Sequence, residues 1–358
     1  MKKNKVLFFG PYPFPITGQS ISFREVYDNF RSDKILFDTT KYGDHKLLNS
    51  LHSLMMLPFV FMFFRFDKVY FTCTRSKLGF IKDFQLLLFC KIFNKKVINH
   101  LHGADFNSFI NNSKWLKKVI KWAYQIIDTS IVLLPSMKSH FSDFPKMKIE
   151  VVRNCYTSEY EDIEVNLNEK KRQVIYLSNI INSKGVFVFL EAIETVLQKD
   201  KEVVVKIAGK IMEDETMIFD QVSDEFNRIK QELKQKYPDR FFYLGLVSGK
   251  EKEQLLMESS IFVLPTFYKS EASPISIIEA MRFGNAIITT KHNYLTDLVS
   301  DKNGFIINPN SVSNLVVVIN KILRNETKLR AIQEYNIQES IKKYSPVFFN
   351  SEIARIIT

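Results

Sequence analysis

The stretch FVLPTFYKSEASPISIIEAMRFGNAIITT, residues 262–290, decides how this chain of 358 residues is interpreted. An apolar run, typical of a buried strand, ends at Pro265, and a polar loop follows it. Ser273 and Pro274 suit the N-cap and the first position of a helix, since proline has a fixed φ and no N–H to lose. The helix is expected to end at Phe283, before Gly284, and a new apolar strand is expected two residues later. This order predicts one unit of a parallel α/β sheet.

The start of the predicted helix is suited to bind an anion. Backbone N–H groups from Ala272 to Ser276 lie at the positive end of the helix dipole, which favours a phosphate group. Glu271 precedes these donors, and Glu279 lies roughly 9 Å further along the helix axis. We therefore expect one carboxylate to contact a sugar near a diphosphate and the other to accept hydrogen bonds from a ribose diol. The paired carboxylates of glycoside hydrolysis, which converge on one bond, are not required by this spacing.

Strand and helix patterns alternate along the rest of the chain, which predicts an α/β protein with two doubly wound parallel sheets. Residues 1–160 would form the first domain, and the tail 344–358 would pack back on it. Residues 170–343 would form the second domain, after the charged linker Glu159–Lys171. Ligands are expected at the carboxyl ends of the strands and in the cleft between the domains. The strand candidates are 5–10, 34–37, 68–73, 97–102, 130–135, 149–153, 173–177, 202–208, 241–246, 260–265, 286–290 and 304–308. The helix candidates include 21–30, 184–198, 214–236, 250–258, 274–283 and 312–324.

The positive charge is concentrated in the first half of the chain. The formal net charge is +11, and residues 1–160 carry 24 Lys and Arg against 12 Asp and Glu. A predicted helix within the segment 114–122 has a basic face that would suit anionic lipids; a solvated face over core tryptophans is the alternative. The eleven-residue run Leu54–Phe64 is too short to span a bilayer, so it predicts either a buried helix or attachment to a membrane surface. The basic residues of the candidate membrane or acceptor surface are Lys114, Lys117, Lys118 and Lys121.

Several kinds of site are missing from the sequence. Cys73, Cys90 and Cys155 are widely spaced and form no CxxC pair, which argues against a disulfide framework and a structural zinc site. There is no DxD motif and no close His/Asp set, so no metal site is predicted. No G-x-G-x-x-G follows the first strand of either half, which argues against a dinucleotide oxidoreductase. Nucleic-acid binding has no supporting motif. The cysteine pattern predicts a reducing cytoplasm as the location, and no secretory signal is visible.

Taken in order, these motifs resemble the retaining glycosyltransferases of family 4, which have the GT-B fold of two Rossmann-like domains facing across a cleft. Glu271 and Glu279 match the family's Glu-x7-Glu motif, and Ala280-Met281 follows as in the family. Further similar segments occur in the family's order, so the resemblance covers most of the chain. They are GPYPFPITGQS (10–20), HLHGAD (100–105), VVRN (151–154), YLSNIINSKG (176–185), VKIAG (205–209) and FFYLGLV (241–247).

The resemblance implies an acceptor-binding first domain and a donor-binding second domain. Glu271 would contact the donor sugar, His102 would lie against it as a second catalytic residue, and Lys184 would neutralise the diphosphate. The family's arginine is replaced by Asn179, so Lys210 is a candidate for the missing cation. His100 is a weaker candidate than His102 and is expected to point into the sheet. The remaining residues implied to bind the donor are Gly18, Ala272, Ser273, Pro274, Ile275 and Glu279.

By this resemblance the chain would be a retaining, metal-independent glycosyltransferase of the hexosyltransferase type. It would use a nucleotide sugar as co-substrate, with no other cofactor, and a glycan acceptor attached to a lipid. Its role would be in bacterial capsule, O-antigen or exopolysaccharide synthesis, in the cytoplasm or at the inner face of the plasma membrane. The alternatives are another GT-B enzyme, such as a nucleotide-sugar epimerase, a catalytically silent homologue acting as a scaffold, and a basic protein that binds nucleic acid or membranes without catalysis.

Overall fold

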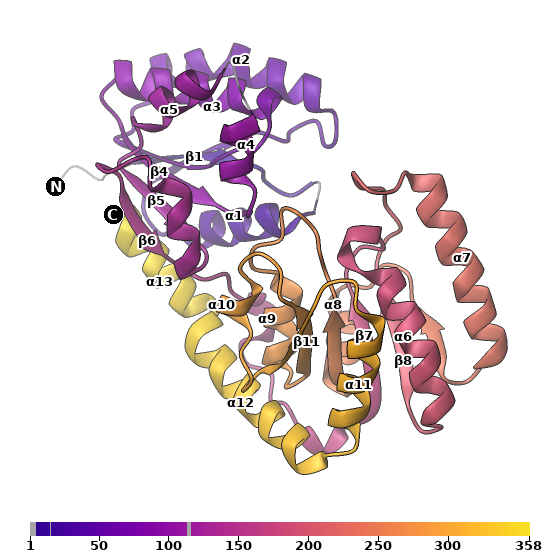
Figure 1. Cartoon of the computed structure of the whole chain (residues 1–358). Coiled ribbons are helices and arrows are strands. Elements are labelled where there is room, and N and C mark those ends of the chain that lie inside the picture. The colour runs from indigo at the N-terminus through magenta and orange to yellow at the C-terminus, as the bar shows by residue number, and fades with distance from the viewer. Residues whose placement is uncertain (1–4, 15, 113–115) are drawn as a thin grey trace. The chain divides into compact units, whose positions relative to one another are not determined.

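The chain folds into two compact units, which we call the first and second unit. The computed structural model describes residues 5–14, 16–112 and 116–358. The first unit comprises Met1–Cys155 and Pro346–Thr358, and the second comprises Tyr156–Ser345. Each unit contains one six-stranded parallel sheet with helices on its faces (Figure 1). The predicted fold class, two doubly wound α/β domains, is thereby confirmed.

The sheet of the first unit has the strand order β2-β1-β3-β4-β5-β6, and all its strands are parallel. Its strands are β1 (Val6–Gly10), β2 (Lys34–Asp38), β3 (Lys68–Thr72), β4 (Lys96–Leu101), β5 (Thr129–Val132) and β6 (Lys148–Val151). Its helices are α1 (Gly18–Asn29), α2 (Lys46–Phe63), α3 (Lys77–Ile92), α4 (Phe106–Asn112), α5 (Lys117–Tyr124), the 3-10 helix η1 (Pro135–Phe141) and α13 (Pro346–Ile357).

Aromatic side chains fill one face of the first sheet, beneath α1 and α13. The ring of Phe8 meets those of Phe23, Phe30 and Tyr70 at centroid distances of 6.2, 5.2 and 5.2 Å. Phe349 of the C-terminal helix α13 belongs to the same buried cluster. Helices α2, α3 and α5 cover the opposite face of the sheet (Figure 1). Both faces of the sheet are therefore covered, as parallel sheets require.

Helix α2 contains the apolar run Leu54–Phe64 and begins eight residues before it, at Lys46. Pro58 lies inside the helix and has no N–H to donate to the carbonyl of Leu54, four residues earlier. The side-chain amide of Gln85, on α3, donates to that carbonyl at 2.8 Å instead. The helix thus tolerates its proline because a neighbouring helix supplies the missing donor, which also fixes α2 against α3.

The sheet of the second unit has the order β12-β11-β10-β7-β8-β9. Its strands are β7 (Lys171–Leu177), β8 (Val204–Ala208), β9 (Phe241–Tyr243), β10 (Ser259–Leu264), β11 (Ala286–Thr290) and β12 (Gly304–Ile307). Its helices are α6 (Val186–Lys199), α7 (Phe219–Lys236), α8 (Gly249–Glu258), α9 (Ile275–Arg282), α10 (Leu295–Leu298), α11 (Val312–Leu323) and α12 (Glu326–Tyr344). The 3-10 helices are η2 (Ser158–Tyr160), η3 (Leu167–Glu169) and η4 (Asn182–Lys184).

Three helices of the second unit begin later than the sequence predicts, and the first of them, α6, begins at Val186 rather than at Lys184, after the 3-10 helix η4. Helix α7 was expected from Asp214 but begins at Phe219, because the Asp214 carboxylate accepts hydrogen bonds from the N–H groups of Thr216 and Met217 and holds a turn there. Helix α9 begins at Ile275. The residue that caps it is Pro274, with a non-helical ψ of 121°, so the prediction of Ser273 as N-cap is wrong by one position.

The order of the second sheet reverses direction between β7 and β10, which are neighbours in the sheet. Crossover connections leave such a pair of strands toward opposite sides, so their carboxyl ends border a natural ligand crevice. The loops at this point are residues 178–185, after β7, and residues 265–274, after β10. These loops carry most of the residues predicted to bind a donor.

Candidate functional site

The two loops at the reversal point of the second sheet are locked together through their backbones. Gly185 has a left-handed φ of 76°, and a Cβ atom there would lie 2.1 Å from the carbonyl oxygen of Pro265. The N–H of Phe267 donates to the carbonyl of Ser183 at 2.7 Å. Glycine is required at residue 185 both by its φ and by this close approach. The loops therefore present their side chains from a fixed frame.

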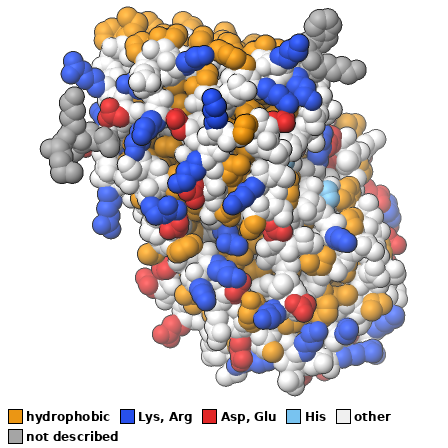
Figure 2. All heavy atoms as spheres, turned by 60° about the vertical axis from the view of Figure 1, so that its left-hand side comes forward, with side chains coloured by type: hydrophobic (Ala, Val, Ile, Leu, Met, Phe, Trp, Pro, Cys, Tyr) orange, Lys and Arg blue, Asp and Glu red, His pale blue; other side chains and the backbone are white. Residues whose placement is uncertain are grey.

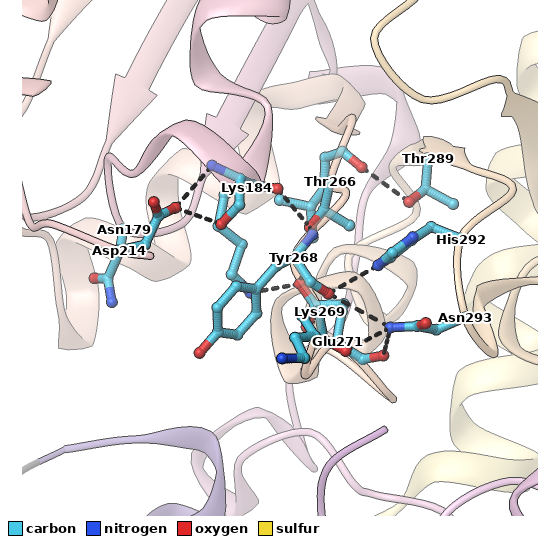
Figure 3. A network of polar contacts seen from close by, with 12 residues as sticks. Asn179, Lys184, Asp214, Thr266, Tyr268, Lys269, Glu271, Thr289, His292 and Asn293 are labelled. Carbon is cyan, nitrogen blue, oxygen red and sulfur yellow. Dashed lines mark hydrogen bonds and ion pairs between the residues drawn. The ribbon is translucent and has the colours of Figure 1, made fainter. Parts of the chain in front are cut away.

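Lys184 and Glu271 lie 87 residues apart in sequence and meet at this point (Figure 3). The Lys184 ammonium is 2.5 Å from Oε2 of Glu271, and the two side chains are only 15% and 8% exposed. The ammonium also lies over the ring of Tyr268, 5.0 Å from its centroid. Such a buried pair is costly to break from one side only, because the remaining charge is left without a partner.

Further hydrogen bonds fix the loop that carries Glu271. Thr266 donates from its hydroxyl to Oε2 of Glu271 at 3.2 Å. The side-chain amide of Asn293 donates to the carbonyls of Glu271 and Lys269 at 2.9 and 3.0 Å. Asn293 itself has a left-handed φ of 45°, which asparagine tolerates better than most residues. Thr266, after β10, thus holds the carboxylate of Glu271, and Asn293, after the neighbouring strand β11, holds its backbone (Figure 3).

The start of α9 provides the backbone donors that the sequence predicted. Ala272, Ser273 and Pro274 are buried, while Ile275 and Ser276 are half-buried. Within the part of the chain that the structure describes, no acceptor is found for the N–H groups of Ile275 and Ser276, as expected for the first turn of a helix. These donors follow directly after Glu271, so an anion bound to them would be a close neighbour of the Lys184–Glu271 pair.

Glu279, on α9, forms a second buried ion pair. Its carboxylate oxygens lie 2.7 and 2.6 Å from the ammonium of Lys252, on α8. Burial raises the pKa of Glu279 above its ordinary value, and the neighbouring Lys252 partly opposes this shift. The two predicted carboxylates are therefore held apart, each by its own lysine. A diol that bound Glu279 would share this carboxylate with Lys252.

Asn179, which stands where the resemblance placed an arginine, is exposed. Its side chain lies apart from the Lys184–Glu271 pair in Figure 3. The nearby Lys210 is also exposed, and its carbonyl accepts from the N–H of Ile180 at 2.9 Å. Within the described residues Lys210 forms no ion pair, and its backbone lies beside residue 180 at the carboxyl end of β8. Lys210 thus lies beside the loop that carries Asn179, where a cation replacing the missing arginine would have to lie.

Asp214 fixes the loop that carries Lys184. Its carboxylate accepts from the N–H and the hydroxyl of Ser183 at 2.9 and 2.5 Å, and from Thr216 on its other oxygen. Burial alone would raise the pKa of Asp214, but the hydrogen bonds from Ser183 and Thr216 lower it to about 2. Asp214 is therefore ionised at neutral pH and holds Ser183, the residue before Lys184.

The other predicted site residues belong to the first unit. Gly18 is the exposed first residue of α1, after the cap Thr17. His100 is fully buried, and its Nδ1 is 2.6 Å from the hydroxyl of Tyr70, so it is part of the interior of the sheet as expected. Nε2 of His102 is buried and, among the described residues, has no hydrogen-bond partner. Burial, then His100 and Arg75, hold the pKa of His102 well below its ordinary value, so its ring is neutral.

The predicted basic surface on α5 is only partly available. Lys121 pairs with Asp143 at 2.6 Å, and Lys117 donates to Asn111 at 2.9 Å. Lys118 is exposed. Lys114 lies outside the described residues. The positions of these residues do not test a contact with a lipid or an acceptor, so the membrane or acceptor surface stays a prediction.

Within the described residues, no group of three or more His, Cys, Asp or Glu side chains is placed to hold a metal ion. Whether the reaction needs a metal is a separate question, which stays a prediction. The three cysteines are buried and free.

Sequence reasoning missed several residues that build the site. Thr266, Tyr268 and Asn293 follow strands β10 and β11, and their places at the carboxyl ends of neighbouring strands were a usable signal. Lys252 had no such signal, because it lies on a helix 27 residues before its partner Glu279. Charge partners of this kind are brought together only by the packing of helices.

A sequence model of the family described as "Glycosyl transferases group 1" matches residues 158–339 of the chain. Two curated proteins are similar to it. The putative teichuronic acid biosynthesis glycosyltransferase TuaC of Bacillus subtilis is 26% identical over 233 residues, which cover 62% of this chain and 53% of that protein. The chain therefore aligns with about half the length of that relative. The uncharacterized glycosyltransferase MJ1069 of Methanocaldococcus jannaschii is 22% identical over 83% of this chain and 79% of that protein.

Among solved structures, Alr3699/HepE of Anabaena has a similar fold. Its complex with UDP has a TM-score of 0.74 to this chain at 14% identity, and the match covers 98% of this chain and 99% of that one. Its complex with UDP-glucose gives a TM-score of 0.72 at 15% identity, covering 98% of each chain. At this identity the likeness establishes the fold, which is GT-B as expected. With the family match spanning half of its residues, the chain belongs to the glycosyl transferases group 1 family.

Proposed function

We propose that the protein is a retaining glycosyltransferase of family 4 and of the hexosyltransferase type. It transfers a sugar from a nucleotide-sugar donor to a glycan acceptor attached to a lipid. The observation that carries this proposal is the buried pair of Lys184 and Glu271 at the reversal point of the second sheet, directly before the backbone donors of α9. A cation, a carboxylate and unpartnered N–H groups in one place suit a sugar linked to a diphosphate.

Each part of this site has a chemical task in the proposed reaction. The diphosphate gains negative charge as its bond to the sugar breaks, and Lys184 together with the N–H groups of Ile275 and Ser276 stabilises that charge. Such fixed donors are usually the largest single contribution to catalysis. Since Lys184 is bound to Glu271, a diphosphate would compete for its ammonium and leave the Glu271 carboxylate to contact the sugar.

Residues outside this pair complete the proposed assignment. Glu279 binds the ribose diol, while Lys210, beside Asn179, supplies the second cation to the diphosphate. The neutral ring of His102, with its buried Nε2, contacts the sugar from the acceptor side. Gly18 allows the loop after β1 to come near the donor phosphates. The acceptor hydroxyl attacks on the face that the diphosphate leaves, which retains the anomeric configuration.

The donor and the cellular role are inferred from relatives. The complexes of HepE with UDP and UDP-glucose support a uridine nucleotide sugar as donor. The name of TuaC, which refers to teichuronic acid biosynthesis, supports a role in bacterial surface polysaccharide synthesis. An acceptor attached to a lipid requires that the enzyme works at a membrane, and we propose the cytoplasmic face. The reaction is proposed to need no metal, so transfer rates should be the same with and without EDTA.

Donor binding and transfer test this function directly. A thermal-shift panel of UDP-, GDP-, ADP- and TDP-sugars should show one donor that raises the melting temperature, because a ligand that binds only the folded state stabilises it. With that donor, Glu271→Gln should lower kcat at least about 100-fold. NMR of the product should show the anomeric configuration of the donor.

The control is Glu194→Gln, which disrupts the exposed pair of Glu194 with Lys236 and should leave kcat unchanged. Melting curves of both variants check that they fold. No stabilisation by any nucleotide sugar, or full activity in Glu271→Gln, would contradict the proposal. An altered nucleotide sugar without a glycoside product would favour an epimerase instead.

A further inference from the structure

Helix α2 of the first unit presents an apolar surface to solvent. Within the described residues it is the one helix long and apolar enough, by length and composition, to cross a membrane, and only 28% of it is buried. Met62 and Phe63 are 70% and 72% exposed, among the most exposed large apolar side chains of the chain. The apolar side chains that face outward along the helix include Leu47, Leu51, Met55, Phe59, Met62 and Phe63.

The fold does not need these outward side chains. The buried residues of α2 are Asn49, Ser53, Leu57 and Phe61, one every fourth position, and two of the four are polar. A single stripe at this spacing is what one face of a helix contributes to a core. The remaining apolar side chains therefore cost solubility without stabilising the unit, which indicates that they bind something else.

The apolar surface continues onto the two neighbouring helices. Helix α2 packs against α3, and α3 packs against α5. Leu78 and Ile81 on α3, and Val119 and Trp122 on α5, are exposed as well. Figure 2 shows hydrophobic side chains gathered at the top of the view, where α2 lies, with Lys and Arg side chains around them. We call the outward sides of α2, α3 and α5 the apolar face.

The charges of the apolar face are almost all positive. Asp83 is the only acidic residue in α2, α3 and α5, and it is fully buried. Outside these helices, Asp143 neutralises one lysine of α5. An apolar centre with cations around it is complementary to an anionic bilayer, because each nearby Lys or Arg is attracted to the anionic headgroups. The lysines of the face include Lys46, Lys77, Lys91, Lys117, Lys118 and Lys121.

We propose that the apolar face docks on an anionic lipid bilayer, with α2 lying in the headgroup region parallel to the membrane. Helix α2 lies on the membrane and does not span it, because it connects β2 and β3 of one parallel sheet and is held to α3 by Gln85. The purpose of this contact rests on the proposed function, since an acceptor attached to a lipid is found at a membrane. The lysines of α5 are the edge of the surface, and α2 is its centre.

Vesicle binding by the full chain tests the proposal without any donor or acceptor. The chain should co-sediment with vesicles of phosphatidylglycerol and phosphatidylcholine, and more weakly with phosphatidylcholine alone or at high salt. The triple variant Phe59→Ser, Met62→Ser, Phe63→Ser should lower the partition coefficient at least about tenfold, because three apolar side chains no longer enter the lipid. The variant Lys46→Gln, Lys77→Gln, Lys91→Gln should weaken binding to anionic vesicles only.

A matched control replaces exposed apolar side chains of the second unit: Ile218→Ser, Phe219→Ser, Leu246→Ser. It should bind vesicles like the unchanged protein. Unchanged binding by the α2 variant, or equal losses in the control, would overturn the proposal. So would a stable dimer in solution that the α2 variant dissociates, because a second copy would then cover the face. Donor cleavage measured without lipid should be the same in all these variants, so a failure of the proposed function is separately visible.

Discussion

Two helices of equal length show how differently the two units meet their surroundings. Helix α2 in the first unit and α7 in the second unit both have 18 residues, and each connects two strands of a parallel sheet. Each buries a narrow stripe, which in α7 consists of Val222, Phe226 and Leu233. The outward side of α7 carries charged residues, while that of α2 carries Leu, Met and Phe. The fold requires apolar residues only in the buried stripe, so the composition of the outward side reflects what that side contacts.

A similar contrast holds for charge. Residues 1–160 have a net charge of +12, while residues 161–358 have 26 Lys and Arg against 27 Asp and Glu. In the second unit the charged residues of the candidate site form two pairs, Lys184 with Glu271 and Lys252 with Glu279. We propose that charge in the first unit attracts an anionic membrane surface and that charge in the second unit binds the donor. The following variants test this division.

The largest effect on stability is expected for a side chain of α2 that is buried against the first unit. Leu57→Ala removes a fully buried side chain and should lower the free energy of unfolding by about 2–5 kcal/mol. Met62→Ala removes a side chain of the same helix that is mostly exposed, and should change it by less than about 0.5 kcal/mol. Urea unfolding of both variants measures the difference. Equal losses would mean that the outward side of α2 also stabilises the fold.

A smaller effect is expected at the frame of the site in the second unit. Gly185→Ala must place a Cβ against the carbonyl of Pro265 at a left-handed φ, so it should cost about 1–3 kcal/mol and raise the KM for the donor. Gly245→Ala is the matched control, since Gly245 has a φ of 70° with open space around it. This control should lower the free energy of unfolding by only about 1 kcal/mol, because the left-handed backbone conformation is then the one unfavourable feature for alanine. Unfolding curves and donor titrations that do not separate the two variants would contradict the close-packed frame.

The smallest effect concerns pH. Because the pKa of Asp214 is about 2 in the folded protein and about 3.9 in an unfolded chain, its ionised form stabilises the fold fully above about pH 4. This contribution is lost as the pH falls from about 4 to 2. Asp214→Asn should therefore lower the free energy of unfolding by about 1 kcal/mol at pH 6. The stability of this variant should also fall less steeply as the pH is lowered through this acidic range.

The control for this experiment is Asp224→Asn on α7, an exposed carboxylate that makes no hydrogen bond within the described residues. Thermal unfolding between pH 2 and 7 compares the two variants with the unchanged protein. An acid limb that is equally steep in Asp214→Asn would show that this carboxylate does not hold the loop of Lys184.

Much of the fold could be predicted because parallel strands are short apolar runs with glycine or proline at their ends. All twelve strand candidates correspond to strands β1–β12, with ends that differ by a few residues. Errors occurred at helix starts, where single side chains decide the boundary: Asp214 delays α7, and the capping box of Thr17 with Ser20 starts α1 at Gly18 rather than at Ile21. Such a cap depends on the geometry of one hydrogen bond, and the periodicity of apolar residues carries no information about that geometry.

For the site, the sequence by itself determined which strands lead into it, the start of α9 to within one residue, and the presence of Glu271, Glu279 and Lys184 near them. Only the tertiary structure decided that Lys184 pairs with Glu271 and Glu279 with Lys252, because these partners are 87 and 27 residues apart and meet through sheet order and helix packing. The same holds for α2. Its composition was evident from the sequence, but which of its apolar side chains face water depends on the sheet and the helix it packs against.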